Sequence, residues 1–310
     1  MRCAPYSHLS VATRPRLGPS SQDLEAALTE RTRVFILCNP SNPTGAVHSA
    51  ALLEKLAAVL RKWPKVTIFA DEIYEQITYD EPCVCFATLP GMYERTVTLN
   101  GFSKGPAMTG FRLGYVAAPT HVAAACAKVQ SQNTSCPCSV SQMAAIAAIR
   151  EVKPQWYADA VAGYRKKRDY TLKRLRAMPH CEHVYTPEGA FYAFPSVKGC
   201  FGKKVRAVPH RTRRTRRTRR AARAAPHTPG AVLMSARSCA RPLLPSQTPK
   251  GTTIVDAEGV CLYLLEECLL ALVPGEAFGE GECVRLSYAA SMETITEAMD
   301  KMEKGLRALK

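Results

Sequence analysis

Residues 96–115 read TVTLNGFSKGPAMTGFRLGY and decide the fold that we expect for this chain. The first four residues are typical of a strand, and they lead into a loop of small residues that carries one lysine, Lys104. A lysine held between apolar stretches loses solvation, which favours its neutral, nucleophilic amine. Ser103 precedes the lysine and Arg112 follows it, and a hydroxyl with a guanidinium can hold a phosphate. The stretch therefore indicates a reactive lysine beside a phosphate site.

Two further segments are typical of buried strands that end in polar residues. Residues 34–45 read VFILCNPSNPTG and stop in a turn that contains Asn42, and residues 66–74 read VTIFADEIY, with Asp71 and Tyr74 near their end. Open α/β sheets bind ligands beyond the carboxyl ends of their strands, so we expect these side chains to surround the lysine loop. A carboxylate can keep a pyridine nitrogen protonated, while an amide and a phenol can hydrogen-bond the ring oxygen. Together the groups predict a site for pyridoxal phosphate (PLP).

A fourth segment adds a carboxylate-binding group. Residues 283–289 read CVRLSYA, which places Arg285 in an alternating strand where its guanidinium can bind a carboxylate with two hydrogen bonds. Taken singly, each candidate has an ordinary explanation: Asn42 as a turn former, Asp71 as a helix N-cap, Arg285 as a solvated strand residue and Ser103 as a loop serine. Only their occurrence together favours one common site.

These segments resemble the class I aminotransferases of PLP fold type I. They are most similar to the bacterial-type aspartate aminotransferases, including the plastid aspartate/prephenate branch. The resemblance covers about residues 20–202 and 251–310, and its motifs occur in the order of the family. It extends to four more motifs: LPGMYERT at 89–96, QSQ at 130–132, GAFY at 189–192 and ALVPGEAFG at 271–279.

The resemblance implies an α/β fold of PLP fold type I, in which a mostly parallel sheet with helices on both faces forms a large domain and a C-terminal α+β small domain follows. We expect a basic, irregular N-terminus at 1–19 and part of the large domain at 20–152. A linking helix at 153–178 and the small domain at 179–310 complete the chain. Within the small domain we expect strands at 182–186 and 190–195. Because the match begins in the middle of the large domain, we expect the family's N-terminal third to be absent.

The resemblance also implies a role for each candidate residue. Lys104 forms the Schiff base with PLP and carries the proton between the substrate carbon and the cofactor. Asp71 pairs with the pyridinium nitrogen, while Tyr74 and Asn42 hold the ring oxygen. Arg285 and Asn42 bind the α-carboxylate of the substrate. The phosphate is bound by Ser103 and Arg112.

The implied activity is PLP-dependent exchange of an amino group between an L-amino acid of the aspartate or glutamate type and a 2-oxo acid. Another fold type I activity, such as a C–S β-lyase, would use the same residues. A truncated, non-catalytic homologue is the alternative from outside the enzymes. The resemblance further implies a homodimer and an intracellular location, in a plastid or otherwise in the cytoplasm.

The net charge of +16 is concentrated in one segment. Between Lys203 and Lys250 there are fourteen Lys and Arg and no acidic residue, which leaves +2 for the rest of the chain. Residues 211–220 read RTRRTRRTRR, and a run of like charge cannot bury a core, so we expect a disordered insert at 204–250. No aromatic residue alternates with the arginines, so we expect no nucleic-acid binding despite the charge.

Cysteine and apolar patterns exclude other classes. The thirteen cysteines are scattered, and the Cys83-x-Cys85 and Cys136-x-Cys138 pairs lack the spacing of zinc or redox sites. We therefore expect no metal site and reduced thiols in an intracellular compartment. The longest apolar runs are too short to span a bilayer, so we expect no membrane segment.

Overall fold

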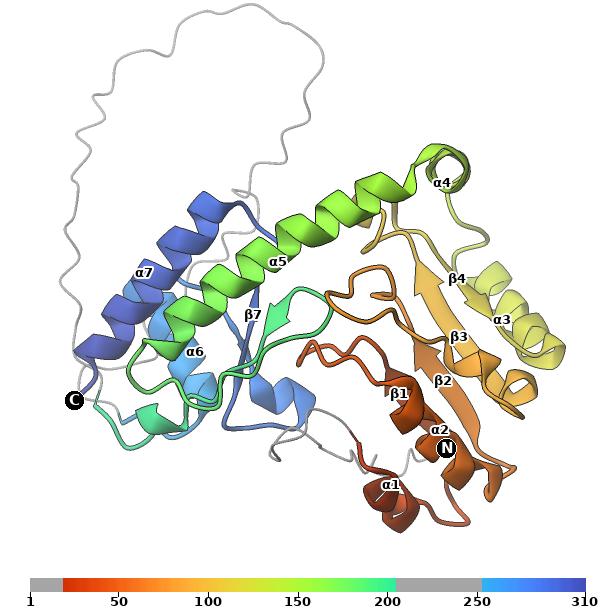
Figure 1. Cartoon of the computed structure of the whole chain (residues 1–310), viewed down its shortest axis with the longest axis horizontal. Helices are drawn as coiled ribbons and strands as arrows, with labels where there is room; N and C mark the ends of the chain where they lie inside the picture. The colour runs from red at the N-terminus through yellow and green to blue at the C-terminus, as the bar shows by residue number, and fades with distance from the viewer. Residues whose placement is uncertain (1–18, 205–252) are drawn as a thin grey trace, which may run out of the picture.

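The computed structural model of the chain describes residues 19–204 and 253–310 (Figure 1). The predicted N-terminus at 1–19 and insert at 204–250 lie almost entirely outside these described residues. The helices are α1 Ser21–Ala27, α2 Ala50–Arg61, α3 Thr120–Asn133, α4 Ser139–Glu151, α5 Pro154–Arg176, α6 Ala257–Cys268 and α7 Met292–Ala308. The strands are β1 Val34–Cys38, β2 Thr67–Asp71, β3 Thr96–Gly101, β4 Gly114–Ala117, β5 Tyr192–Ala193, β6 Val273–Pro274 and β7 Val284–Ser287.

The first four strands form one sheet in the order β1-β2-β3-β4. β1, β2 and β3 are parallel, and β4 runs antiparallel to β3 at the edge, which confirms the mostly parallel sheet. The register aligns Cys38 with Asp71 and Asp71 with Leu99. Because parallel strands end at the same edge of a sheet, the turn after β1, the Asp71 carboxylate and the lysine loop meet there.

Helix α2 packs one face into the core beneath this sheet. The Ser49 hydroxyl accepts a hydrogen bond from the Leu52 N–H, which caps the helix. Leu53, Leu56 and Leu60 are fully buried, and they belong to the same core as β2. Each of these leucines stabilises the fold by roughly 1.5–3 kcal/mol of apolar burial.

A second, antiparallel sheet in the order β5-β7-β6 lies in the C-terminal part, with α5, α6 and α7 around it (Figure 1). Tyr74, Ile77 and Tyr79 come from the loop after β2, yet they belong to the core of this C-terminal part. The segment that follows Asp71 therefore joins the two sheets. Helix α5 lies inside the predicted linking segment 153–178, while the domain boundaries themselves stay a prediction.

A tight turn gives a second connection between the two parts. Gly45 has a φ of +72°, and its carbonyl accepts hydrogen bonds of 2.8 Å from the N–H groups of Glu188 and Gly189. A Cβ on Gly45 would lie 2.5 Å from Cβ of Pro187. Only glycine combines this conformation with so close an approach, so the turn after β1 is fixed against the C-terminal part.

The predicted strand at 182–186 is wrong. This segment contributes only an isolated bridge between Glu182 and Ser196, and His183 has a positive φ of 46°, which interrupts an extended strand. The strand expected at 190–195 is reduced to β5. Ala190 has a φ of 53° and Pro195 has no N–H to donate, so the extended pairing ends on both sides.

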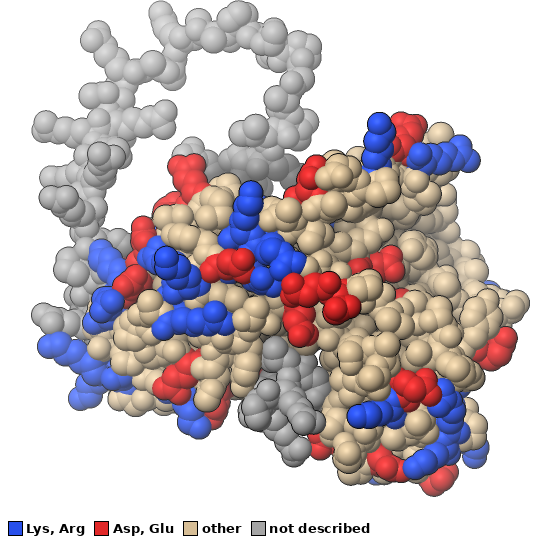
Figure 2. Space-filling model, viewed as in Figure 1, with Lys and Arg blue, Asp and Glu red and all other residues tan. Residues whose placement is uncertain are grey.

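Charges of both signs are interspersed over much of the face that Figure 2 shows. On α5 and α7, Arg174 lies 2.7 Å from Asp300 and 3.1 Å from Glu303, and Arg307 lies 2.8 Å from Glu303. This mixture agrees with the near-neutral balance of the chain outside the arginine-rich segment. Within residues 19–204 and 253–310, no helix has both the length and the apolar composition needed to cross a bilayer.

Candidate active site

Lys104 lies in the loop after β3, between two aromatic rings. Its Nζ is 5.5 Å from the ring centroid of Tyr74 and 5.4 Å from that of Phe191. Burial lowers the pKa of Lys104, and the positive charges of Arg285 and Arg112 lower it further, while Asp71 opposes them. The surroundings therefore favour the neutral amine that a carbonyl-reactive lysine needs.

Asp71 and Tyr74 stand at the end of β2 and in the loop that follows. Asp71 is the last residue of the strand, and its carboxylate accepts a 3.3 Å hydrogen bond from the Ile73 N–H. Tyr74 is only 3% exposed, and its hydroxyl lies 2.7 Å from the hydroxyl of Tyr192. Burial raises the pKa of Tyr74, so its phenol keeps its proton and stays available as a hydrogen-bond donor.

Arg285 on β7 meets the turn after β1. Its guanidinium donates a 2.8 Å hydrogen bond to Oδ1 of Asn42. The Cζ atom lies 4.7 Å from the ring centroid of Tyr192 and 4.9 Å from that of Phe278. A guanidinium has five N–H donors, so the bond to Asn42 leaves others of the fork for a carboxylate.

The two predicted phosphate ligands are less closely tied to the other site residues. Arg112 adopts a left-handed conformation with a φ of 52°, is exposed, and donates a 2.8 Å hydrogen bond to the Thr109 carbonyl. Its charge nevertheless acts on the Lys104 amine. Ser103 is half-buried and is placed beside Lys104 by the chain itself. The charge of Lys104 therefore interacts with Tyr74, Asp71, Arg112 and Arg285. Asn42 joins this group through its hydrogen bond with Arg285.

Three aromatic residues at the site were missed by the sequence analysis. Phe191 and Tyr192 lie in the GAFY motif, and Phe278 lies in the motif at 271–279, but neither motif suggested a role for them. Their contacts with Lys104, Tyr74 and Arg285 come from separate elements. The one available signal was the presence of aromatic residues in motifs of the family resemblance.

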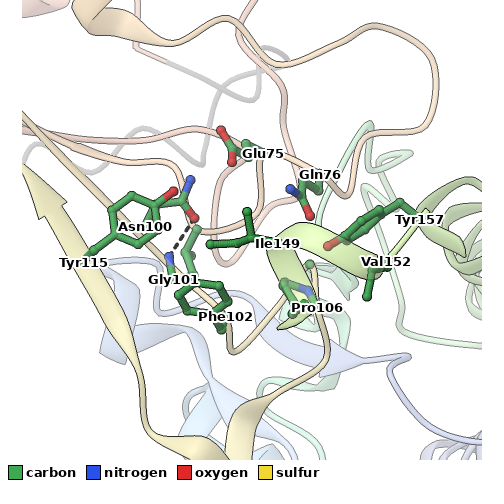
Figure 3. Close-up of a pocket in the computed structure, with 13 residues that line it drawn as sticks. Glu75, Gln76, Asn100, Gly101, Phe102, Pro106, Tyr115, Ile149, Val152 and Tyr157 are labelled. Carbon is green, nitrogen blue, oxygen red and sulfur yellow. Dashed lines mark hydrogen bonds between the residues drawn. The ribbon is translucent and has the colours of Figure 1, made fainter. Parts of the chain in front are cut away.

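A cavity of about 500 Å³ opens beside the lysine loop (Figure 3). Glu75, Gln76 and Asn100 contribute polar groups to its lining, with Asn100 on one side and Tyr157 of α5 on the other (Figure 3). The complete lining is Ile73, Glu75, Gln76, Asn100, Gly101, Phe102, Gly105, Pro106, Tyr115, Ala148, Ile149, Val152 and Tyr157. None of the seven predicted site residues is among them, so this space adjoins the candidate site without containing its reactive groups.

The cysteines near the site are inert thiols. Burial raises the pKa of Cys38 and of Cys83 to about 12, so both stay protonated. In the part of the chain that the structure describes, no group of three or more His, Cys, Asp or Glu side chains is arranged to hold a metal ion.

Comparisons with known proteins agree with this architecture. The family model for "Aminotransferase class I and II" matches residues 10–302. An aspartate aminotransferase from Pinus pinaster is 38% identical over 286 residues, which is 91% of this chain and 49% of that protein. A bifunctional aspartate and glutamate/aspartate-prephenate aminotransferase from Petunia hybrida is 38% identical over 290 residues, covering 93% of this chain and 51% of that protein.

The solved structures lead to the same fold. The crystal structure of aspartate aminotransferase from Rhizobium meliloti matches with a TM-score of 0.75 and 34% identity, over 94% of this chain and 62% of that one. The fold is that of the PLP fold type I enzymes. The chain belongs to the class I and II aminotransferases. It spans about half the length of the curated plant relatives that it matches.

The residues present fit PLP, on which enzymes of this family generally depend. The donor set offers a desolvated amine, a carboxylate at a strand end, a protonated phenol, an amide and two guanidinium groups. These groups correspond to the aldehyde, ring nitrogen, ring oxygen and phosphate of PLP, and to the carboxylate of a substrate.

Proposed function

We propose that this chain carries the PLP-binding and carboxylate-binding residues of an aminotransferase. The reaction exchanges an amino group between an L-amino acid of the aspartate or glutamate type and a 2-oxo acid. The observation that carries the proposal is the position of Lys104. Its amine lies between the rings of Tyr74 and Phe191, and burial, together with the charge of Arg285, lowers its pKa.

PLP, when bound, supplies the electron sink that lets the amino group move. Lys104 is the residue that binds it covalently and that accepts and returns a proton at Nζ. The Asp71 carboxylate holds the proton on the ring nitrogen, and the protonated Tyr74 phenol and the Asn42 amide hold the ring oxygen. Ser103 and Arg112 bind the phosphate.

Arg285 binds the α-carboxylate of the substrate in this proposal. The rings of Tyr192 and Phe278 lie close to its guanidinium, and Asn42 holds one edge, so the free edge has a defined direction. The choice of an aspartate- or glutamate-type substrate rests on the relatives, whose names contain aspartate, glutamate and prephenate.

We also propose that the protein forms a homodimer. Val140, Met143 and Ile149 of α4 are 70%, 65% and 71% exposed, which is unusual for large apolar side chains on one helix. A second copy would bury them. Analytical ultracentrifugation tests this, because a monomer at micromolar concentration would contradict it. A plastid is the proposed compartment because of the resemblance to the plastid aspartate/prephenate branch, and fractionation of the source tissue tests it.

The function is tested by adding PLP to the purified chain, recording its visible absorbance and mapping the borohydride-reduced product. We expect a yellow band, with the pyridoxyl group trapped on Lys104. Lys104→Ala abolishes both, whereas Lys128→Ala, at an exposed position on α3, changes neither. Incubation with L-aspartate or L-glutamate and a second 2-oxo acid as amino acceptor then yields the 2-oxo acid of the donor and the amino acid of the acceptor. Release of a thiol from a sulfur amino acid instead would indicate a β-lyase, and label scattered over surface lysines would indicate a non-catalytic homologue.

A further inference from the structure

Tyr192 lies between the two halves of the candidate site. Its hydroxyl is 2.7 Å from the hydroxyl of Tyr74, and its ring centroid is 4.7 Å from the guanidinium carbon of Arg285. The side chain is only 6% exposed, so both contacts are sheltered from water. One residue thus contacts a group assigned to the cofactor and a group assigned to the substrate.

The contact with Arg285 is one of three that restrain the guanidinium. Phe278 presents a second ring at 4.9 Å, and Asn42 accepts a 2.8 Å hydrogen bond from one of the nitrogens. Attraction between a cation and an aromatic ring strengthens where water is excluded. The ring of Tyr192 therefore helps to hold the guanidinium in one orientation.

The hydrogen bond between Tyr192 and Tyr74 has a defined donor when Tyr74 itself donates a hydrogen bond to a ligand. A phenol has a single O–H to donate. If Tyr74 donates that proton to a ligand oxygen, the 2.7 Å bond must be donated by Tyr192. A donated hydrogen bond polarises the Tyr74 O–H and makes it a stronger donor.

We propose that Tyr192 is a positioning residue that couples the carboxylate-binding Arg285 to the cofactor-facing Tyr74. This inference rests on the proposed function for its meaning in catalysis, but its two contacts can be tested without cofactor. The hydroxyl of Tyr192 acts on Tyr74, and the ring acts on Arg285, so the two effects separate by substitution.

The chain offers a matched control in a second pair of tyrosines. The hydroxyls of Tyr79 and Tyr288 are 3.0 Å apart, and both residues lie in the same core as Tyr192. Tyr79 also donates a hydrogen bond to the Ala190 carbonyl. Tyr288→Phe therefore removes a buried hydroxyl whose partner, Tyr79, is not a proposed site residue.

The first measurement is the pH dependence of Lys104 labelling by an amine reagent in the cofactor-free chain, read by peptide mapping. In Tyr192→Leu the guanidinium of Arg285 is no longer held in place, so its charge lowers the pKa of Lys104 less. The labelling midpoint therefore moves to higher pH, toward the midpoint of Arg285→Leu. Tyr192→Phe and Tyr288→Phe leave it unchanged. An unchanged midpoint in Tyr192→Leu would overturn the role of the ring.

The second measurement is thermal unfolding of Tyr74→Phe, Tyr192→Phe and the double variant. If the hydroxyls form one bond, the double variant melts no lower than the less stable single variant. Fully additive losses, as expected for Tyr192→Phe combined with Tyr288→Phe, would overturn the role of the hydroxyl.

The third measurement uses the PLP-loaded chain. Tyr192→Phe moves the pH midpoint of the visible band upward by about one unit, because a weaker donor at Tyr74 stabilises the more negative form of the chromophore less. Tyr288→Phe leaves it in place, and no shift in Tyr192→Phe would contradict the coupling to Tyr74. If the parent chain forms no band, the proposed function fails for this chain, while the labelling and unfolding results still decide the inference.

Discussion

Arg285 donates a 2.8 Å hydrogen bond to Oδ1 of Asn42 although 243 positions separate the two residues in the chain. Asn42 lies in the turn that Gly45 fixes against the C-terminal part, and Arg285 lies on β7 of that part. The bond therefore connects the carboxyl edge of the parallel sheet with the second sheet. In the proposed function, this bond sets where a substrate carboxylate binds relative to Lys104.

Removing the Asn42 amide should loosen Arg285. With the amino acid as substrate, Asn42→Ala is expected to raise KM about tenfold, which corresponds to the loss of one hydrogen bond to a charged group. Steady-state kinetics of the PLP-loaded chain measure this. Asn133→Ala, at an exposed position on α3, is the control and should leave KM unchanged. An unaltered KM in Asn42→Ala would show that Arg285 is held by other contacts.

The pKa of Lys104 should respond to its charged neighbours with opposite signs. Arg285 lowers this pKa and Asp71 raises it. Arg285→Gln should therefore move the midpoint of Lys104 labelling to higher pH, whereas Asp71→Asn should move it to lower pH. In the parent chain the midpoint should lie below 10.5, the ordinary pKa of a lysine. A midpoint at that ordinary value would contradict the desolvated amine on which the proposed function depends.

The turn that carries Asn42 should not tolerate a side chain at Gly45. A Cβ there would lie 2.5 Å from Cβ of Pro187, at a φ of +72° that disfavours other residues. Gly45→Ala should destabilise the fold by about 1–3 kcal/mol through overpacking and backbone strain. Gly163 in α5 meets nothing within 4 Å, so Gly163→Ala should stabilise by about 0.5–1 kcal/mol. Denaturant unfolding measures both, and a neutral effect at Gly45 would be inconsistent with the close approach.

The sequence predicted the parallel strands and the turn because their signals are local. The apolar run Val34–Cys38 stops at a Pro- and Gly-containing turn, and this pattern alone predicts a buried strand that ends there. The carboxyl-edge rule then placed Asp71 and Lys104 together. These inferences need only the pattern of the chain and the geometry of a parallel sheet.

Features that depend on contacts between distant segments were not predictable. The sequence predicts a strand at 182–186, but His183 takes a positive φ that no local residue pattern requires. The part played by Tyr192 needs Tyr74 and Arg285, which belong to different elements. The cavity beside the lysine loop likewise needs α4 and α5 to pack near β3.

His48 should make stability depend on pH. It is 5% exposed, and burial lowers its pKa from 6.5 to about 4. Because the folded state binds this proton less readily than the unfolded state, stability is full above pH 6.5 and is lost as the pH falls toward 4. The loss amounts to roughly 3 kcal/mol.

The difference between the parent and His48→Gln isolates this effect from that of the carboxylates. Unfolding between pH 7 and pH 4 should show a steeper fall for the parent than for the variant. His121→Gln, at an exposed position in α3, should follow the parent curve. Parallel curves for the parent and His48→Gln would mean that His48 is solvated and titrates normally.

The arginine-rich segment should be dispensable for the fold, because its flanks meet. Lys204 and Thr253 form an antiparallel bridge, and the Ile254 N–H donates a 2.9 Å hydrogen bond to the Lys203 carbonyl. A two-residue Asn-Gly turn can close such a pair of strands. Replacing residues 206–251 by a short Gly- and Asn-containing loop should therefore leave the melting temperature and PLP labelling of Lys104 unchanged.

Any salt-sensitive retention on nucleic acid by the parent should disappear with the segment, because the rest of the chain carries little net charge. Retention that survives the replacement would place a nucleic-acid surface on the folded part, and a large drop in melting temperature would show that the segment packs against it.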